Sequence, residues 1–340
     1  MKIDFQKIVV GLSLALATFA VVKVNRVSHH GGIAKQVKDT KKRVDGIEVC
    51  IGKKYISANC FNLFNKLLLK ETLRKYTYLL NKPYDESTID RTTKYPNKIW
   101  IYWNQDIATA PRYVQECIKS IKRNSGNREV IILNKKNVTD YIYIPQHVML
   151  AYKEGNISHM QFSDIVLTCC LYEHGGMYVD ATTYFSDYPA EIFEKELCLL
   201  MTESFNKENF REYRSYNIIE GSFAYVKSPK NYIFHILRNF CFEYCKDHWQ
   251  VPYFFWYSFA VLAFEEDLRF QKIIYNHVVN NEYLRFVPVK IFAKYLHKKF
   301  DKNKWEEIKT KSKIHKFSNR RCKNILEGSF LDKLIKGELD

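Results

Sequence analysis

The sequence predicts an α/β protein, a Rossmann-like domain with a mixed, mainly parallel sheet, preceded by an N-terminal helical extension. From Lys98 to Val179, short apolar segments alternate with segments of helical periodicity, which is typical of a parallel sheet. From Ser158 to Asp180, a capped helix, a double glycine and a strand ending on a carboxylate follow one another. The 340 residues are 46% hydrophobic and suffice for one substantial core.

The first predicted strand lies within residues 95–105, YPNKIWIYWNQ, where Pro96 marks a loop and a run of apolar and aromatic residues follows. Residues 111–123 then show helical spacing, and residues 129–133, EVIIL, form a short apolar strand. Strand, helix and strand in this order predict the first half of the parallel sheet.

The next helix is predicted to begin at His159, because Ser158 and Gln161 form a capping box. Gly175 can close this helix in the left-handed conformation, and Gly176 allows the chain to turn sharply. The strand formers that follow place Asp180 at the carboxyl end of a strand, where open α/β sheets place ligands. Asp180 is therefore a candidate metal ligand; the alternative is that Asp164 and Asp180 are an exposed helix charge and a turn aspartate.

The block FSDI at residues 162–165, followed by GG at 175–176 and YVDAT at 178–182, resembles the family 32 glycosyltransferases. Within them it is most similar to the capsular polysaccharide synthesis proteins. The large glucosylating bacterial toxins have a related block with the same spacing between the two aspartates. The resemblance covers roughly residues 96–316 and implies the glycosyltransferase A-type fold and transfer from a nucleotide-sugar.

By this resemblance, Ser163 and Asp164 bind the donor, Tyr178 touches it, and Asp180 serves the ribose and the metal. Asp180 and Asp164 are the expected catalytic residues. The other expected donor-binding residues are Trp103, which would stack on the nucleobase, Thr182, and His315 and Lys316, which would close over the diphosphate. The alternatives are that Trp103 is a core aromatic of a strand and that His315 and Lys316 belong to a basic surface tail.

Three positions depart from the pattern. Leu167 stands where relatives have an arginine, whose guanidinium would neutralise diphosphate charge. Thr182 stands where many relatives carry the second aspartate of a D-x-D motif, which leaves Asp180 as the single motif carboxylate. Pro252 replaces an aspartate of relatives, so no acceptor contact is assigned there.

The implied chemistry needs charge neutralisation as the diphosphate departs. Mn²⁺ or Mg²⁺, bound by Asp180, substrate phosphates and water, would supply it. Asp164 would accept hydrogen bonds from sugar hydroxyls. The resemblance further implies retention of anomeric configuration, and the sequence identifies no nucleophile.

The formal charge of +16 suits anionic partners such as nucleotide diphosphates, an acidic glycan or an anionic bilayer. No nucleic-acid motif is present, so we expect no nucleic-acid partner. The 9 cysteines show neither a disulfide framework nor paired C-x-x-C knuckles, which favours buried free thiols and a reducing compartment.

We expect four regions: a membrane-associated apolar helix at 1–26, a basic helical extension at 27–94, a catalytic domain at 95–320 and a tail at 321–340. The apolar run at residues 8–22 is shorter than the roughly 20 residues that a span needs, so it could form a thin span, lie in the interface or be buried. The lysines and arginines that follow it favour the cytoplasmic face of the membrane. The extension could dock on the membrane or a partner, or pack on the catalytic domain.

The resemblance therefore implies a nucleotide-sugar-dependent hexosyltransferase, and we expect a UDP-sugar as the donor. The expected acceptor is a growing capsular or surface polysaccharide, bound to lipid at the membrane surface. The alternatives are a catalytically degenerate scaffold of a polysaccharide synthesis complex, a basic binding protein, and an enzyme that transfers sugar onto a protein.

Overall fold

The computed structural model describes residues 49–51, 54–56, 73–84, 97–201, 219–247, 255–279, 290–318, 322 and 324–339. The chain divides into two compact units, Met1–Thr72 and Leu73–Asp340. In the first unit, β1 (Val49–Ile51) pairs antiparallel with β2 (Lys54–Ile56). The predicted apolar helix, most of the basic extension and Pro252 lie outside the described residues. No helix within the described ranges is both long and apolar enough to cross a bilayer.

The second unit is built on a five-stranded sheet with the order β4-β3-β5-β8-β7. Its strands are β3 (Lys98–Tyr102), β4 (Glu129–Leu133), β5 (Gly176–Val179), β7 (Leu197–Met201) and β8 (Ile219–Val226). β3 is parallel to both β4 and β5, whereas β8 runs antiparallel to its neighbours β5 and β7. The predicted mixed, mainly parallel sheet is confirmed.

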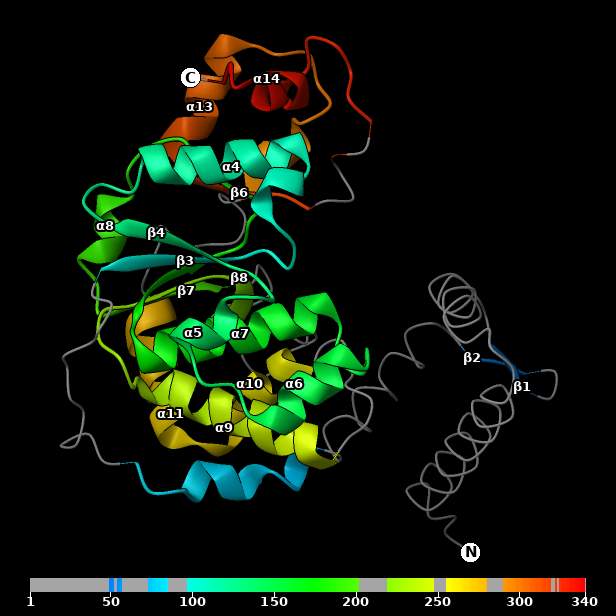
Figure 1. Cartoon of the computed structure of the whole chain (residues 1–340), viewed down its shortest axis with the longest axis vertical. Helices are drawn as coiled ribbons and strands as arrows, with labels where there is room; N and C mark the ends of the chain where they lie inside the picture. The colour runs from blue at the N-terminus through cyan, green and yellow to red at the C-terminus, as the bar shows by residue number, and fades with distance from the viewer. Residues whose placement is uncertain are drawn as a thin grey trace, which may run out of the picture. The chain divides into compact units, whose positions relative to one another are not determined.

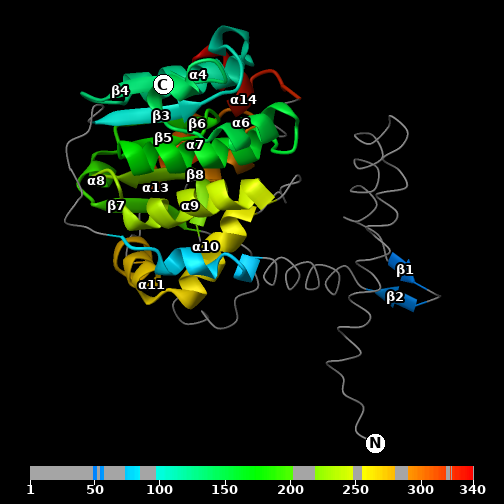
Figure 2. The same ribbon diagram turned by 60° about the horizontal axis from the view of Figure 1, so that its bottom comes forward.

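Helices cover both faces of this sheet, with α4 (Arg112–Arg123) on one face and α7 (His159–Glu173) on the other (Figure 1). Figure 2 shows the same arrangement from below, with α9, α10 and α11 beyond α7. The other helices of the described part are η1 (Thr77–Asn81), η3 (Ile107–Thr109), α5 (Val138–Tyr141), α6 (Gln146–Lys153), α8 (Ala190–Phe193), α9 (Tyr232–Asp247), α10 (Phe255–Glu266), α11 (Leu268–Ile274), η5 (Tyr275–Val279), η7 (Phe292–Lys294), α13 (Lys302–Lys311) and α14 (Phe330–Lys336).

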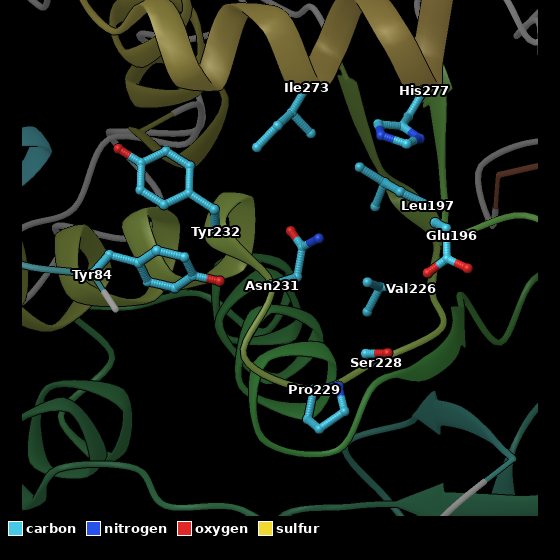
Figure 3. Close-up of a pocket in the computed structure, with 10 residues that line it drawn as sticks. All are labelled: Tyr84, Glu196, Leu197, Val226, Ser228, Pro229, Asn231, Tyr232, Ile273 and His277. Carbon is cyan, nitrogen blue, oxygen red and sulfur yellow. The ribbon is translucent and has the colours of Figure 1, made fainter. Parts of the chain in front are cut away.

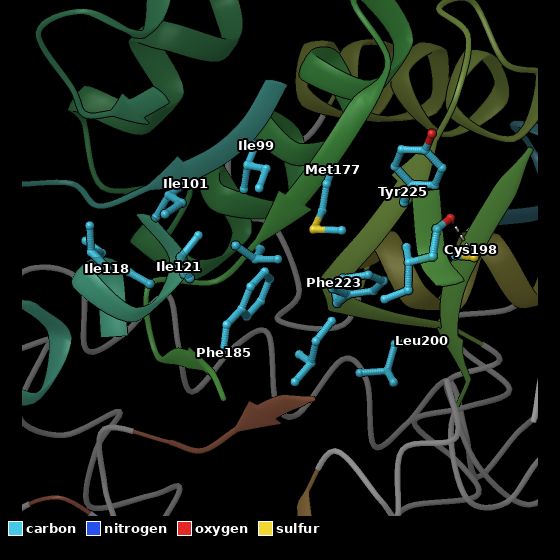
Figure 4. Close-up of a cluster of buried hydrophobic side chains, with 14 of the residues drawn as sticks. Ile99, Ile101, Ile118, Ile121, Met177, Phe185, Cys198, Leu200, Phe223 and Tyr225 are labelled. Atoms are coloured by element: carbon cyan, nitrogen blue, oxygen red, sulfur yellow. Dashed lines mark hydrogen bonds between the residues drawn. The ribbon is translucent and has the colours of Figure 1, made fainter. Parts of the chain in front are cut away.

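A hydrophobic cluster fills the space between α4 and the sheet (Figure 4). Alternate residues of the strands enter it, because successive side chains of a strand point to opposite faces. Its members include Ile99, Ile101, Val114, Ile118, Ile121, Met177, Val179, Phe223 and Tyr225. This burial holds β3, β5 and β8 together, and with them the strand ends that carry the polar residues described below.

The predicted start and end of α7 are confirmed. The Ser158 amide donates to Gln161 Oε1 at 2.8 Å, and the Gln161 amide donates to Ser158 Oγ at 3.3 Å. Gly175 and Gly176 have φ values of 68° and 88°. A Cβ at Gly176 would lie 2.5 Å from the carbonyl oxygen of Lys98, so the chain can pass this close to β3 only without a side chain.

A second sheet that the sequence did not predict joins β6 (Thr183–Phe185) to β9 (Ile314–Lys316). The strands are antiparallel, with Thr183 opposite Lys316. This pairing brings residues near the end of the chain beside the segment that follows β5. An aromatic-rich cluster from η7, α13 and α14, including Phe292, Trp305 and Phe330, packs behind it.

Residues 73–84 pack on the helical side of the second unit. Leu73 and Leu79 are fully buried, and the Tyr76 ring lies 5.5 Å from the rings of Phe240 and Tyr244 on α9. For residues 73–84, these contacts agree with the alternative in which the extension packs on the domain that follows it. The 7 described cysteines with assigned burial are buried free thiols, as expected.

Candidate active site

Asp180 is the first residue after β5, and backbone hydrogen bonds fix the turn that carries it. Its amide donates to the carbonyl of Ser222 at 2.9 Å, and its own carbonyl accepts from the amide of Thr183 at 3.0 Å. Its side chain is 32% exposed. Asp180 therefore presents a partly solvated carboxylate at the carboxyl end of a central strand, where the sequence places it.

Lys316 supplies a positive charge at this point. Its Nζ lies 2.9 Å from Asp180 Oδ2 and donates to Thr182 Oγ1 and, at 3.0 Å, to the carbonyl of Phe317. The Lys316 side chain is only 14% exposed, so its ammonium is held in place rather than left in solvent. Lys316, Asp180 and Thr182, three of the predicted site residues, thus lie together.

Asp164 approaches Asp180 from the second turn of α7, on the face of the sheet opposite α4, and is buried. Burial raises the pKa of its carboxyl well above the usual value, and the nearby charges of Asp180 and Glu220 raise it further. A hydrogen bond from the Tyr257 hydroxyl, at 3.5 Å from Asp164 Oδ1, acts in the opposite direction on this pKa. Asp164 is therefore buried away from solvent, near the carboxylates of Asp180 and Glu220.

Glu220 and Gly221 from β8, and Tyr257 from α10, are site residues that sequence reasoning missed. An ideal Cβ built on Gly221 would come within 2.5 Å of Asp164 Oδ1. Nothing local in the sequence marks Glu220 and Tyr257, because β8 and α10 meet α7 only through the tertiary fold. The one available signal was a glycine inside a strand pattern, which often marks a close approach.

Ser163 and Tyr178 form a pair between α7 and β5. Ser163 Oγ and Tyr178 Oη lie 2.7 Å apart, and the Tyr178 ring is fully buried. Burial is the main cause that raises the pKa of the Tyr178 hydroxyl. This hydrogen bond ties the predicted donor-binding turn of α7 to the strand that ends on Asp180. Direct contact of either residue with a donor stays a prediction.

The structure separates His315 from Lys316. His315 is fully buried, its Nε2 lies 2.9 Å from Ser186 Oγ, and its ring packs against Phe292 and Trp305. Burial lowers the pKa of His315 from 6.5 to about 3. Neighbouring strand residues point to opposite faces, so the side chains of the expected pair diverge, and only Lys316 reaches Asp180.

Trp103 follows β3, and its half-buried ring packs against the cluster between α4 and the sheet. Its indole N–H is buried and has no hydrogen-bond partner among the described residues. The ring thus has the core contacts of the alternative interpretation, and stacking on a nucleobase stays a prediction. Leu167 is fully buried, so the position of the family arginine lies inside the protein in this chain.

The residues present fit a divalent ion only in part. Within the described ranges, no group of three His, Cys, Asp or Glu side chains is arranged to hold a metal ion. Asp180 offers one carboxylate, whose Oδ2 is paired with Lys316. A single carboxylate is compatible with Mg²⁺ or Mn²⁺ sites in which one or two carboxylates combine with substrate phosphates and water.

A cavity of about 280 Å³ lies at the other end of the sheet (Figure 3). It is lined by residues that include Leu197 and Val226, which pair with each other and lie beside the start of β5 rather than its end. None of the predicted site residues lines it. The cavity is therefore separate from the carboxylate site.

Comparison with known proteins agrees with the motif block. No curated protein matches the chain. Among solved structures, "PaToxG Glycosyltransferase" matches with 14% identity and a TM-score of 0.33, over 62% of this chain and 85% of that one, a likeness too distant to carry an argument. A family model described as "Capsular polysaccharide synthesis protein" matches residues 50–334, which include α7, β5, β8 and β9. The chain belongs to the capsular polysaccharide synthesis protein family.

Proposed function

We propose that the protein is a glycosyltransferase that moves a hexose from a nucleotide-sugar, with a UDP-sugar as the first candidate, to a growing capsular or surface polysaccharide. One observation carries the proposal: in a chain of this family, Asp164, Asp180 and Lys316 converge at the carboxyl end of β5. Sugar transfer needs carboxylates that accept hydrogen bonds from sugar hydroxyls and a cation that neutralises the charge of the departing phosphate, and this arrangement offers both.

In this proposal Lys316 provides a fixed ammonium beside the departing diphosphate. Asp180 and Thr182 hold that ammonium, so little reorganisation is needed when the negative charge on the leaving group increases. Mn²⁺ or Mg²⁺ bound at Asp180 would supply further charge neutralisation. Asp164 accepts hydrogen bonds from the sugar, and retention of anomeric configuration is the stereochemical outcome we propose.

The proposed acceptor is a glycan, carried on lipid at the cytoplasmic face of the cell membrane. The basic residues after the N-terminal apolar segment support this location. The formal charge of +16 favours contact with an anionic bilayer surface.

A catalytically degenerate scaffold of a polysaccharide synthesis complex is the second candidate. It is favoured by the buried Leu167 in place of an arginine and by Thr182 in place of a second carboxylate. Turnover of a nucleotide-sugar distinguishes the two candidates.

The test is a thermal-shift panel of the full chain with UDP, GDP, CDP and ADP, each with and without Mn²⁺. Stabilisation by one nucleotide that is enhanced by metal and reduced in Asp180→Ala would support the donor site and identify its base. No stabilisation by any of the four would favour the scaffold.

A further inference from the structure

Tyr257 links α10 to the Asp164 carboxylate. Its hydroxyl lies 3.5 Å from Asp164 Oδ1, and a hydrogen bond with the backbone of Gly221 acts on the same hydroxyl. This bond lowers the pKa of the Tyr257 hydroxyl, which is the effect of a backbone N–H that donates to the hydroxyl oxygen, so the Tyr257 proton can point at Asp164. The three residues form a short polar chain from β8 through α10 to α7.

Gly221 provides the space in which this chain forms. A Cβ at this position would lie 2.5 Å from Asp164 Oδ1 and 2.9 Å from the Tyr257 hydroxyl oxygen. The backbone of Gly221 does not have a positive φ, so the glycine is required here by space and not by conformation. The pairing of β8 with β7 slips at this point, since Leu199 lies opposite Ala224 whereas Leu200 lies opposite Glu220.

Trp256, the residue before Tyr257 on α10, contacts α7 close to Asp164. Trp256 Nε1 donates to Thr168 Oγ1 at 2.9 Å, and the Thr168 hydroxyl donates to the carbonyl of Asp164 at 2.7 Å. Trp256 and Thr168 are both buried. Asp164 is thus connected to α10 through its carbonyl and through its carboxylate, which restricts both its backbone and its side chain.

We propose that Tyr257 is a positioning residue that sets the Asp164 carboxylate for a hydroxyl of the donor sugar, and that Gly221 keeps this site open. The proposal rests on the proposed function. Tyr257 engages Oδ1, so the second oxygen of Asp164 can accept from the sugar, and the carboxylate cannot rotate freely. Tyr257 thereby acts on the sugar part of the donor, whereas Lys316 and Asp180 act on the diphosphate.

The experiment compares binding of nucleoside diphosphates and of their glucose, galactose and N-acetylglucosamine conjugates by calorimetry, using the full-length protein. Tyr257→Phe removes one hydroxyl and should weaken binding of the preferred nucleotide-sugar about 5- to 10-fold, while affinity for the nucleoside diphosphate stays unchanged. In Asp164→Ala, which has no side-chain acceptor, the further change Tyr257→Phe should have little additional effect, because Tyr257 acts through Asp164.

Tyr225→Phe is the matched control, since Tyr225 is on the same strand as Gly221 but its hydroxyl donates to the carbonyl of Phe193 at 3.3 Å. It should bind both ligands as the wild type does. Gly221→Ala should lose more nucleotide-sugar affinity than Tyr257→Phe, because its Cβ displaces the Asp164 side chain. Melting curves of each variant test whether the protein is still folded.

Wild-type affinity for the nucleotide-sugar in Tyr257→Phe would overturn the positioning role. An equal loss on adding Tyr257→Phe to Asp164→Ala would also overturn it, because Tyr257 would then act independently of Asp164. If the wild-type protein binds neither a nucleoside diphosphate nor a conjugate, the proposed function itself fails, and this outcome is distinct from the other two.

Discussion

Lys316 Nζ lies 2.9 Å from Asp180 Oδ2, although the two residues are far apart in the chain. The pairing of β6 with β9 closes this distance, because β6 begins just after Asp180 and β9 ends at Lys316. Both side chains are partly shielded from solvent, so their interaction is screened less than that of a surface ion pair. The Lys316 ammonium is therefore held beside the turn that follows β5.

Replacing Lys316 should weaken diphosphate binding. Lys316→Met keeps the apolar stem but removes the ammonium, and we expect affinity for the preferred nucleoside diphosphate to fall about tenfold, or about 1.4 kcal/mol. Calorimetric titration measures the change. Lys313→Met is the control, since Lys313 pairs with Glu191 at 3.1 Å, and it should bind as the wild type does. Unchanged affinity in Lys316→Met would place its ammonium outside the donor site.

Removing the Asp180 carboxylate should abolish metal-dependent activity. Asp180→Ala should reduce turnover by on the order of 100-fold or more, because charge stabilisation of the leaving group is lost. The variant should remain folded, since its backbone hydrogen bonds to Ser222 and Thr183 do not involve the side chain. Nucleotide-sugar consumption in the presence of Mn²⁺ gives the rate. Full turnover in this variant would contradict the metal assignment.

Trp103→Ala should weaken donor binding chiefly through the base. Stacking on an aromatic ring contributes about 1–3 kcal/mol per base, so a loss of this size is expected for the whole nucleotide. Trp103→Phe keeps a flat ring and should retain most of the affinity. Because Trp103 also packs on the core, melting temperatures are measured beside the affinities. A lower melting temperature with unchanged affinity would leave only the packing role.

Introducing arginine at Leu167 should destabilise the fold. From the sequence alone, the family arginine predicts tighter diphosphate binding in such a variant. The structure shows Leu167 fully buried, so an arginine would carry an unpaired charge into the protein at a cost of about 3–5 kcal/mol. Urea unfolding measures this cost. Leu150→Arg, at a position 46% exposed, should have little effect. Tighter diphosphate binding in a stable Leu167→Arg protein would contradict this expectation.

Buried His315 should make the fold sensitive to acid. Its folded pKa of about 3 lies below the usual 6.5, so the unfolded chain binds a proton more readily. The contribution of neutral His315 to the free energy of unfolding is therefore complete above pH 6.5. It is lost as pH falls towards 3, by about 1.4 kcal/mol per pH unit.

The measurement for His315 is the free energy of unfolding between pH 7 and pH 4. His315→Gln cannot take up a proton and should show a shallower decrease than the wild type. Burial also lowers the pKa of His235, to about 4, so the free energy of unfolding of both proteins should still depend on pH. Parallel curves for the two proteins would show that His315 is not the titrating group.

Local sequence determined the part of the fold that depends on neighbours in the chain. The capping box fixed the start of α7, the two glycines fixed its end, and the apolar run of β5 placed Asp180 at a strand end. These features follow from hydrogen bonding, backbone sterics and side-chain periodicity within a few residues. That Ser163, Asp164 and Tyr178 belong to one site was implied by the resemblance to a known family and not by these local features.

Only the tertiary structure decided which distant residues complete this site. The pairing of β6 with β9 brought Lys316 to Asp180 and turned His315 into the protein, while the approach of β8 and α10 brought Gly221 and Tyr257 to Asp164. Such contacts depend on which strands pair, in which register, and on how helices pack against them. Burial and strand register in the folded chain, not local propensity, set the environment of these side chains.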